Sequence, residues 1–516
     1  MVDNILLGFQ TALSPENLLL CFIGVFVGTV IGLLPGLGSS TGVAVLIPLT
    51  LAFEPVSALI MLAGIYYGAQ YGGTITSVLI STPGEASSVV TTLDGYQMAR
   101  QGRAGPALAI AAIGSFVAAI ISLVLLGLVA PPMAHFALHF GPPENMAVMV
   151  LGFATIISFS GESKLKGLTM AVLGVLIATV GVDPAGGTAR FTFDSVSMLS
   201  GIPYVQVMIG LFAVGEVMYQ IREGAAAPIH ARFKDMVISR ADISRSKGAI
   251  LRGSGLGFLL GCLPGAGSTL ASFLAYGVEK RVSKRGDEFG SGAIEGVAAP
   301  ESANNAAANA NFIPTLTLGI PGGATTAVLL GAFTIYGIQP GQLLFNQQPA
   351  LVWGLLASFF IGNVLLLIMN LPMAPVFAQM LRIPYGYMYP LILFTSFVGA
   401  YAIDNNFFGV WIVFVFGLVG YVMKRFDLPM APLVLGLVIG ALFEKALVQT
   451  SAMGDGNVGI VFTRPISLTV LLLAALFVFG PTLVKRLRGG GGGPPAPGAP
   501  PEKPVGAPTD PEESRV

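Results

Sequence analysis

The sequence predicts an all-α polytopic membrane protein with two inverted-topology repeats, Gly/Pro-broken re-entrant hairpins and about a dozen membrane segments. Only 10% of its 516 residues are charged and 54% are hydrophobic, whereas soluble domains are about one quarter charged. Four stretches without Asp, Glu, Lys or Arg exceed the ~20 residues that cross a bilayer as a helix: 17–53, 55–84, 105–143 and 302–381. The third observation is a pair of matching apolar segments, each broken by Pro-Gly.

Composition also excludes several classes of protein. Lys and Arg number 26, as do Asp and Glu, so no net field would recruit nucleic acid. Cys21 and Cys262 both lie in apolar runs and are interpreted as packing residues rather than a disulfide. Glycine contributes 67 residues, a content that suits closely packed membrane helices. A soluble enzyme, a nucleic-acid binder and a secreted disulfide scaffold are thereby excluded.

The basic residues predict one path through the membrane, because cytoplasmic loops carry an excess of Lys and Arg. A path with the end of the last span in the cytoplasm leaves only Arg190, Lys445 and Arg464 outside. Its simple spans are near 106–130, 145–160, 166–182, 198–220, 350–371, 386–403, 407–423, 430–446 and 466–484. The predicted organisation is a first repeat (1–221), a cytoplasmic linker (222–252), a second repeat (253–464), an extra C-terminal span (465–488) and a disordered tail (489–516).

Two apolar segments do not fit simple spans. Residues 18–53 have flanks without basic residues, whereas 253–278 lie between basic loops, so each segment is predicted to enter and leave on one side as a re-entrant hairpin. Their breaks, Pro35-Gly36 and Pro264-Gly265, match at one constant offset, and Pro83-Gly84 matches Pro321-Gly322 at a slightly larger one. The charge path gives the two copies opposite orientations. Inverted repeats with broken helices indicate the binding site of a secondary transporter.

The paired breaks are therefore the predicted substrate site. A helix interrupted inside the membrane leaves N–H groups that favour anions, and hydroxyls near each break add donors. Alternatively, Pro-Gly pairs only kink helices and Ser or Thr only pack between them. The candidate substrate-binding residues are Gly36, Gly38, Ser39, Ser40, Thr82, Pro83, Gly84, Ser87, Ser88, Gly265, Gly267, Ser268, Thr269, Pro321, Gly322, Thr325 and Thr326.

A second set of polar residues is the candidate cation site. Glu301, Asn304 and Asn305 open the long uncharged stretch, and ionisable groups within a membrane are functional candidates. Glu301 could instead be a helix-start charge at the interface, and the two amides could bond between helices. Glu85 is interpreted as a cation partner or as facing the cytosol.

Several motifs resemble the large membrane subunit of tripartite tricarboxylate transporters, the TctA family. They are Tyr71-Gly72-Gly73-Thr74-Ile75-Thr76, TPGEASS, Leu93-Asp94-Gly95-Tyr96 with QMARQGRAG, LPGAGSTLASFLAYGVEKR, FGSGAIEGVAAPESANNAA and IPTLTLGIPGGATTAVLLGA. The resemblance covers most of residues 20–345. Gln97 in place of Pro and Asn309-Ala310-Asn311 in place of small residues depart from the pattern.

The resemblance implies a multi-pass permease of the bacterial cytoplasmic (inner) membrane, with a TctB-like small membrane subunit and a TctC-like periplasmic solute-binding protein as partners. It implies import of a polycarboxylate such as citrate, or a related di- or monocarboxylate, coupled to a Na⁺ or H⁺ gradient. No cofactor other than the coupling cation, for which Na⁺ is expected, is implied.

Two rival functions remain open at this point. A membrane-embedded enzyme using Ser40 or Glu301 would need a clustered acid/base set. The three histidines of the chain do not supply one, since His135 and His139 lie among prolines at a predicted external span end. A passive anion channel is the other rival, and saturable, gradient-dependent uptake would exclude it.

Overall fold

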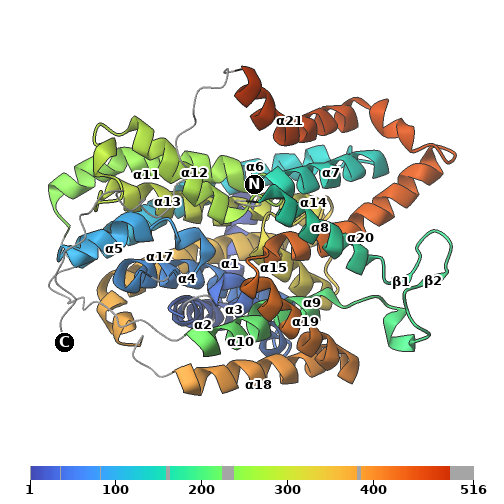
Figure 1. The fold of residues 1–516 in the computed structure, drawn as a ribbon, viewed down its shortest axis with the longest axis horizontal. Helices are drawn as coiled ribbons and strands as arrows, with labels where there is room; N and C mark the ends of the chain where they lie inside the picture. The colour runs from blue at the N-terminus through green and yellow to red at the C-terminus, as the bar shows by residue number, and fades with distance from the viewer. Residues whose placement is uncertain are drawn as a thin grey trace, which may run out of the picture.

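The structure is a computed structural model that describes residues 2–34, 37–81, 83–158, 163–223, 238–380 and 385–487. Figure 1 shows a bundle made almost wholly of helices. Within these residues, six helices are long and apolar enough to cross a membrane: Pro15–Gly32, Ala104–Ala137, Tyr204–Ile221, Pro349–Leu371, Phe407–Arg425 and Met430–Met453. The prediction of an all-α membrane protein is confirmed, whereas the dozen membrane segments and the inversion of the two halves stay predictions.

The first half of the described chain is helical apart from one short hairpin. Its elements are α1 (Val2–Ala12), α2 (Pro15–Gly32), α3 (Gly38–Thr50), α4 (Pro55–Ile80), η1 (Ala86–Ser88), α5 (Thr92–Arg100), α6 (Ala104–Ala137), α7 (Pro142–Ser158), α8 (Lys164–Ala178), β1 (Gly181–Val182), β2 (Ala189–Arg190), η2 (Val196–Met198), α9 (Tyr204–Met208), the π-helical η3 (Ile209–Val214) and α10 (Gly215–Glu223). The strands pair antiparallel, with Gly181 opposite Arg190. This hairpin is not predictable from the sequence, because strands of two residues are too short to show an alternating pattern.

The second half is helical throughout its described residues. Its elements are α11 (Arg240–Gly261), α12 (Gly267–Val282), η5 (Gly286–Glu288), α13 (Glu295–Ala310), α14 (Phe312–Leu318), α15 (Ala324–Ile335), α16 (Leu344–Gln347), α17 (Pro349–Met380), α18 (Tyr385–Asp404), α19 (Phe407–Arg425), α20 (Met430–Met453), η6 (Val458–Phe462) and α21 (Pro465–Leu487). Each simple span predicted from the basic residues overlaps a helix or a run of consecutive helices. The predicted tail lies outside the described residues.

Helix α11 begins inside the range predicted as a cytoplasmic linker. The Ser239 hydroxyl accepts from the Asp242 N–H at 3.0 Å, and the Asp242 carboxylate accepts in return from the Ser239 N–H at 3.4 Å. This capping box satisfies donors that a helix start leaves free. Residues 240–252 are therefore helical, and residues 224–237 of the predicted linker lie outside the described residues.

Glycines allow the same close helix contact in both halves. A Cβ on Gly28 of α2 would lie 2.4 Å from the Ile65 carbonyl oxygen of α4, and a Cβ on Gly257 of α11 would lie 2.2 Å from the Ala303 carbonyl oxygen of α13. Only glycine permits backbones to approach so closely. The same two sequence offsets relate further glycine contacts of the two halves. The contact of Gly24 with Met61 corresponds to that of Gly253 with Ala299, and the contact of Gly32 with Ala69 corresponds to that of Gly261 with Ala307.

The backbone around the breaks is also alike in the two halves. Leu37 N–H donates to the Leu34 carbonyl at 3.2 Å, and Ala266 N–H donates to the Leu263 carbonyl at 3.2 Å. Gly38 and Gly267 then start α3 and α12 with positive φ, +62° and +68°. These residues are glycines because the left-handed region is unfavourable for side chains with a Cβ.

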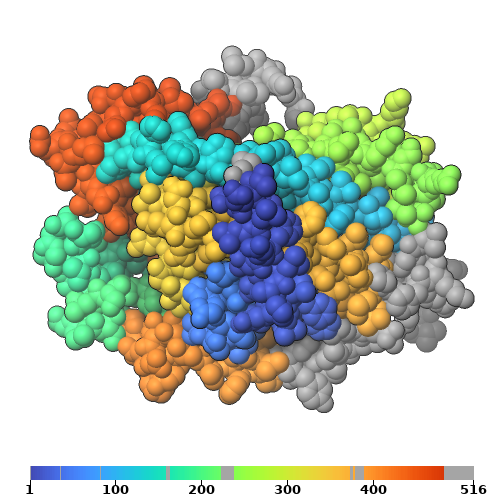
Figure 2. Space-filling model, turned by 180° about the vertical axis from the view of Figure 1, so that it is seen from behind, coloured from blue at the N-terminus to red at the C-terminus, as the bar shows by residue number. Residues whose placement is uncertain are grey.

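Helices α4 and α13 lie inside the bundle, and nearly every residue of both is buried. Around α4 are α2, α3, α6 and α17, and around α13 are α6, α11 and α12. Helices α11, α12 and α13 lie together at the upper left of Figure 1. Helix α1 packs on α17, and the ring centroids of Phe9 and Phe360 lie 6.0 Å apart. Figure 2 shows this N-terminal segment, dark blue, on the surface beside parts of the second half.

Candidate functional site at the helix breaks

The two halves of the chain meet at the starts of α3 and α15. The Ser39 and Thr325 hydroxyl oxygens lie 2.8 Å apart, and the Ser40 hydroxyl lies 3.0 Å from that of Thr325. Ser39 is fully buried and Thr325 is 7% exposed. Ser39 and Thr325, which are 286 positions apart in the chain and each follow a helix break, are thus in direct contact.

Backbone hydrogen bonds join the two breaks of the second half. Gly265 N–H donates to the Pro321 carbonyl at 3.2 Å, and Gly267 N–H donates to the Gly322 carbonyl at 3.1 Å. The starts of α12 and α15 are therefore neighbours. Ser268 and Thr269 lie in the first turn of α12, which has no side-chain cap.

In the first half, a side chain joins the two breaks. One carboxylate oxygen of Glu85 accepts from the Ser39 N–H at 2.6 Å, at the start of α3. Helix N-termini favour negative charge, so this position stabilises the carboxylate. This role differs from the interpretation of Glu85 as a cation partner or a cytosol-facing charge. Pro83 and Gly84 precede it, and a Cβ on Gly84 would collide with the Gly32 carbonyl oxygen. Gly36 and Thr82, also predicted for this site, lie outside the described residues.

Three of the predicted hydroxyls bond within their own half. Ser87 donates to the Gln70 side chain at 2.9 Å. Ser88 donates to the Glu85 carbonyl at 2.9 Å, and Thr326 donates to the Gly323 carbonyl at 3.0 Å while accepting from the Gly323 N–H at 2.9 Å. Ser88 and Thr326 therefore hold equivalent turns, which leaves backbone amides and Thr325 better placed as donors to a ligand.

Glu301 lies in the interior, within α13 rather than at its start. Its carboxylate accepts from the Thr74 hydroxyl of α4 at 2.6 Å and from the Thr91 hydroxyl at 2.5 Å. The residue is 1% exposed, and no basic side chain in the described part of the chain pairs with it. Helix α13 begins at Glu295, so Glu301 is not an interfacial helix-start charge. A buried carboxylate without a cationic partner is costly.

The amides beside Glu301 are only partly bonded. Asn305 Nδ2 donates to the Ser115 hydroxyl of α6 at 2.7 Å, as the alternative of helix-to-helix bonding predicts. The Oδ1 atoms of Asn304 and Asn305 accept no hydrogen bond within the described structure, and both are buried. Free amide oxygens are suitable ligands for a hard cation.

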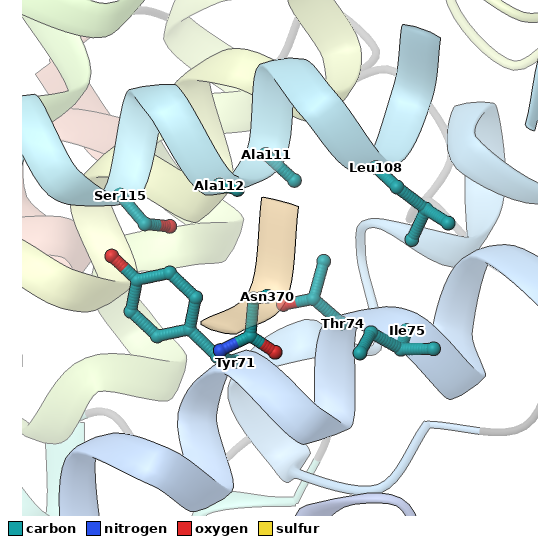
Figure 3. Close-up of a pocket in the computed structure, with 8 residues that line it drawn as sticks. All are labelled: Tyr71, Thr74, Ile75, Leu108, Ala111, Ala112, Ser115 and Asn370. Atoms are coloured by element: carbon teal, nitrogen blue, oxygen red, sulfur yellow. The ribbon is translucent and has the colours of Figure 1, made fainter. Parts of the chain in front are cut away.

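A small cavity of about 20 Å³ lies between α4, α6 and α17. Figure 3 shows Tyr71 and Thr74 on one side and Ser115 on the other, with the hydroxyls of Tyr71 and Ser115 turned toward each other. The volume is enough for about one water-sized particle. Thr74 lines the cavity and bonds Glu301, so the cavity lies beside the carboxylate. Nothing in the sequence indicates that Tyr71, Thr74, Thr91 and Ser115 belong to this site, because their proximity to Glu301 depends on tertiary packing.

Asp94 is a further buried carboxylate that the sequence analysis did not select. It accepts from the N–H groups of Gly290, Gly292 and Ala293 at 2.8 Å each, and from the Tyr276 hydroxyl at 2.8 Å. Its place in the Leu93-Asp94-Gly95-Tyr96 motif was the available signal. These bonds hold the connection between α12 and α13, which makes Asp94 a positioning residue for the second half.

Comparison with known proteins identifies the family of this chain. The model of the tripartite tricarboxylate transporter TctA family matches residues 18–435. This chain belongs to the TctA family. The family is one of transporters, and its tripartite systems contain partner subunits.

Two relatives come from Agrobacterium vitis. An uncharacterized 52.8 kDa protein in the TAR-I ttuC' 3' region is 47% identical over 472 residues, which are 91% of this chain and 94% of the relative. An uncharacterized protein in the TAR-II ttuC' 3' region is 49% identical over 222 residues, which are 43% of this chain and 92% of the relative. No solved structure matches the chain.

Proposed function

We propose that this TctA-family chain is the subunit of a secondary active transporter that moves a carboxylate across the membrane with a coupling cation. The substrate is a tricarboxylate such as citrate, or a related di- or monocarboxylate. The observation that carries the proposal is the meeting of the helix starts at Ser39, Ser40 and Thr325. Helix N-termini from both halves then face one place, where their N–H groups favour an anion.

The proposed substrate site uses neutral donors. It contains the starts of α3, α12 and α15, with Ser39, Ser40, Ser268, Thr269 and Thr325 as donors and the Gly-rich turns as backbone. No Lys or Arg occurs in 253–278 or 302–335. An anion held by dipoles and hydroxyls instead of a fixed cation is released more easily, as a carrier requires.

The proposed cation site is Glu301 with Asn304 and Asn305, extended by Thr74, Thr91 and Tyr71. Its support is a buried carboxylate to which hydroxyls donate, amide oxygens without a partner in the described structure and the adjacent cavity. Moving one charge across 100 mV is worth about 2.3 kcal/mol, so a trianion entering a negative interior costs about 7 kcal/mol. Coupled Na⁺ or H⁺ would offset that cost.

We further propose that the halves are inverted repeats that rock about this site. The glycine contacts of α2 on α4 and of α11 on α13, matched at constant offsets, support the relation of the halves. The excess of basic residues on one side of the predicted path supports their opposite orientations.

The proposal includes a TctB-like small membrane subunit, a TctC-like periplasmic solute-binding protein that delivers the substrate, and a bacterial inner membrane with the C-terminus of this chain in the cytoplasm. The rival enzyme is disfavoured because His135, in the last turn of α6, and His139, just beyond it, make none of the hydrogen bonds described for either cluster. The described residues hold no group of three or more metal-ligating side chains.

Uptake by proteoliposomes tests the proposal. The purified chain would be reconstituted with its proposed partners, and labelled citrate and succinate would be supplied under Na⁺ and pH gradients imposed separately. The proposal expects saturable uptake that one of the gradients accelerates. Non-saturable flux without gradient dependence would support a channel, and chemical conversion of the substrate would support an enzyme.

A further inference from the structure

Gly38 and Gly267 occupy matched positions in the two halves, but their surroundings differ. Gly38 starts α3 and Gly267 starts α12, with nearly equal φ of +62° and +68°. A Cβ on Gly38 would lie 3.3 Å from a carboxylate oxygen of Glu85, whereas a Cβ on Gly267 would meet no atom within 4 Å. The space over the start of α3 thus contains a carboxylate, and no side chain of the described residues fills the matching space over α12.

The difference arises from one residue. At the offset that relates Pro83-Gly84 to Pro321-Gly322, the position of Glu85 corresponds to Gly323. The turns are otherwise alike, since Ser88 bonds the Glu85 carbonyl as Thr326 bonds the Gly323 carbonyl. Ser39 N–H has the Glu85 carboxylate as acceptor, whereas α12 has no side-chain cap for its first-turn amides. The second half therefore presents the amides of Ser268 and Thr269 without the internal carboxylate.

A buried amide beside Gly323 independently indicates a ligand. Asn311 is 2% exposed, and its Oδ1 has no partner within the described residues. A Cβ on Gly323 would lie 3.5 Å from Asn311 Nδ2 and 3.2 Å from Gly267 Cα, so the amide faces the start of α12. Its Nδ2 donates to the Tyr66 hydroxyl over a long 3.3 Å. Nδ2 is the Asn311 atom nearest to a Cβ on Gly323, and only one of its two N–H groups is used by Tyr66, so the other can donate to an anion at the start of α12.

We propose that one carboxylate of the transported substrate binds at the start of α12, to the Ser268 and Thr269 amides and to Asn311, in the place that Glu85 occupies at the start of α3. Glu85 is then a built-in carboxylate that fills the first of two matched anion positions, at the Ser39 amide, and leaves only the Ser39 and Ser40 hydroxyls of α3 to the substrate. The substrate is anchored through one carboxylate at α12, and the rest of the molecule extends toward Thr325. This inference rests on the proposed function and adds the position and number of carboxylate anchors.

Direct binding to the purified full-length chain in lipid nanodiscs tests the inference. Calorimetry would measure the affinities of citrate, succinate and acetate for the wild type, Gly323→Glu and Gly277→Glu. Gly323→Glu supplies the second half with its own carboxylate and should weaken every probe at least 100-fold. Gly277→Glu places the same charge farther along α12, where a Cβ meets nothing within 4 Å, and should change the affinities less than threefold.

A second variant reports on the first half without relying on the fold of Gly323→Glu. Glu85→Ala removes the internal carboxylate, so formate should bind in its place and raise the melting temperature of the variant toward the wild-type value. In the wild type Glu85 occupies this position, so formate should show no second binding site there. Formate fits because it is a carboxylate small enough for the space that the side chain leaves.

The outcomes separate the inference from the proposed function. If the wild type binds none of the carboxylates, the proposed function fails and the inference fails with it. If the wild type binds them and a folded Gly323→Glu binds equally well, only the inference is overturned. If Gly323→Glu does not fold, the absence of formate rescue in Glu85→Ala overturns the inference on its own.

Discussion

The hydroxyl oxygens of Ser39 and Thr325 lie 2.8 Å apart, although 286 residues separate them in the chain. Each residue lies in the first turn of a helix that follows a Gly/Pro-rich turn. The contact brings helix starts from both halves of the chain to one place. A ligand bound there would contact both halves, so movement of one half against the other would change its surroundings.

Close glycine packing predicts that two neighbouring glycines of α11 respond very differently to substitution. Gly257→Ala would place a Cβ 2.2 Å from the Ala303 carbonyl oxygen, whereas a Cβ on Gly255 meets nothing within 4 Å. Overpacking costs about 1–3 kcal/mol or more, so Gly257→Ala should lower the melting temperature and the yield of monodisperse protein. Gly255→Ala is the matched control and should be neutral. Equal behaviour of the two variants would contradict the packing of α11 on α13.

Removal of the Asp94 carboxylate should loosen the connection between α12 and α13. Asp94→Ala leaves the amides of Gly290, Gly292 and Ala293 without their acceptor, and bonds to a charged group are worth about 1.5–3 kcal/mol each. A lower melting temperature and faster amide exchange at these residues are expected. Tyr276→Phe removes one bond and should have a smaller effect, while Asp287→Ala at an exposed position should have none. Unchanged exchange in Asp94→Ala would refute the positioning role.

The coupling cation should depend on the Glu301 charge. Glu301→Gln keeps the side-chain volume and removes the negative charge, so the cation concentration for half-maximal uptake should rise at least tenfold. Linkage then makes the substrate affinity less sensitive to the cation. Ser358→Ala, which removes a buried hydroxyl bonded only to the Leu355 carbonyl among the described contacts, serves as control. Wild-type cation dependence in a folded Glu301→Gln would place the cation elsewhere.

Cysteine labelling tests the inverted orientation. In a background with Cys21 and Cys262 replaced by Ala, single cysteines would be introduced at Glu54, Gly102, Lys284 and Gln342. An impermeant thiol reagent outside sealed, right-side-out vesicles should label positions 54 and 342 only. Labelling at 102 or 284 would be incompatible with the inverted-repeat proposal.

The sequence predicted those features that depend on local composition. Long uncharged stretches located α6 and α17, and Pro-Gly pairs located the breaks before α3 and α12, because apolar length and helix interruption are local properties. It also selected Glu301, since a carboxylate within an apolar segment stands out without any structure.

The remainder of the candidate site depends on contacts that the sequence does not contain. Glu85 was assigned to a cation or to the cytosol because its position over the start of α3 requires the tertiary fold. Nothing in the sequence distinguishes Thr74 and Thr91 from other hydroxyl residues. They become site candidates only because the fold lets their hydroxyls donate to the Glu301 carboxylate. The start of α11 at Arg240 was missed because its charged first turns resemble a loop, although Ser239 and Asp242 cap a helix there.

The central claim is that the helix starts joined by Ser39 and Thr325 form the carboxylate site of a carrier, and Thr325→Val tests it most directly. The substitution keeps the shape and removes the hydroxyl, and a hydrogen bond to a charged group is worth about 1.5–3 kcal/mol. The substrate concentration for half-maximal uptake should therefore rise about 10- to 100-fold. Thr450→Val, which removes a buried hydroxyl of α20 that has no partner among the described residues, should leave it unchanged. Equal half-maximal concentrations in wild type, Thr325→Val and Thr450→Val, at equal membrane abundance, would contradict the claim.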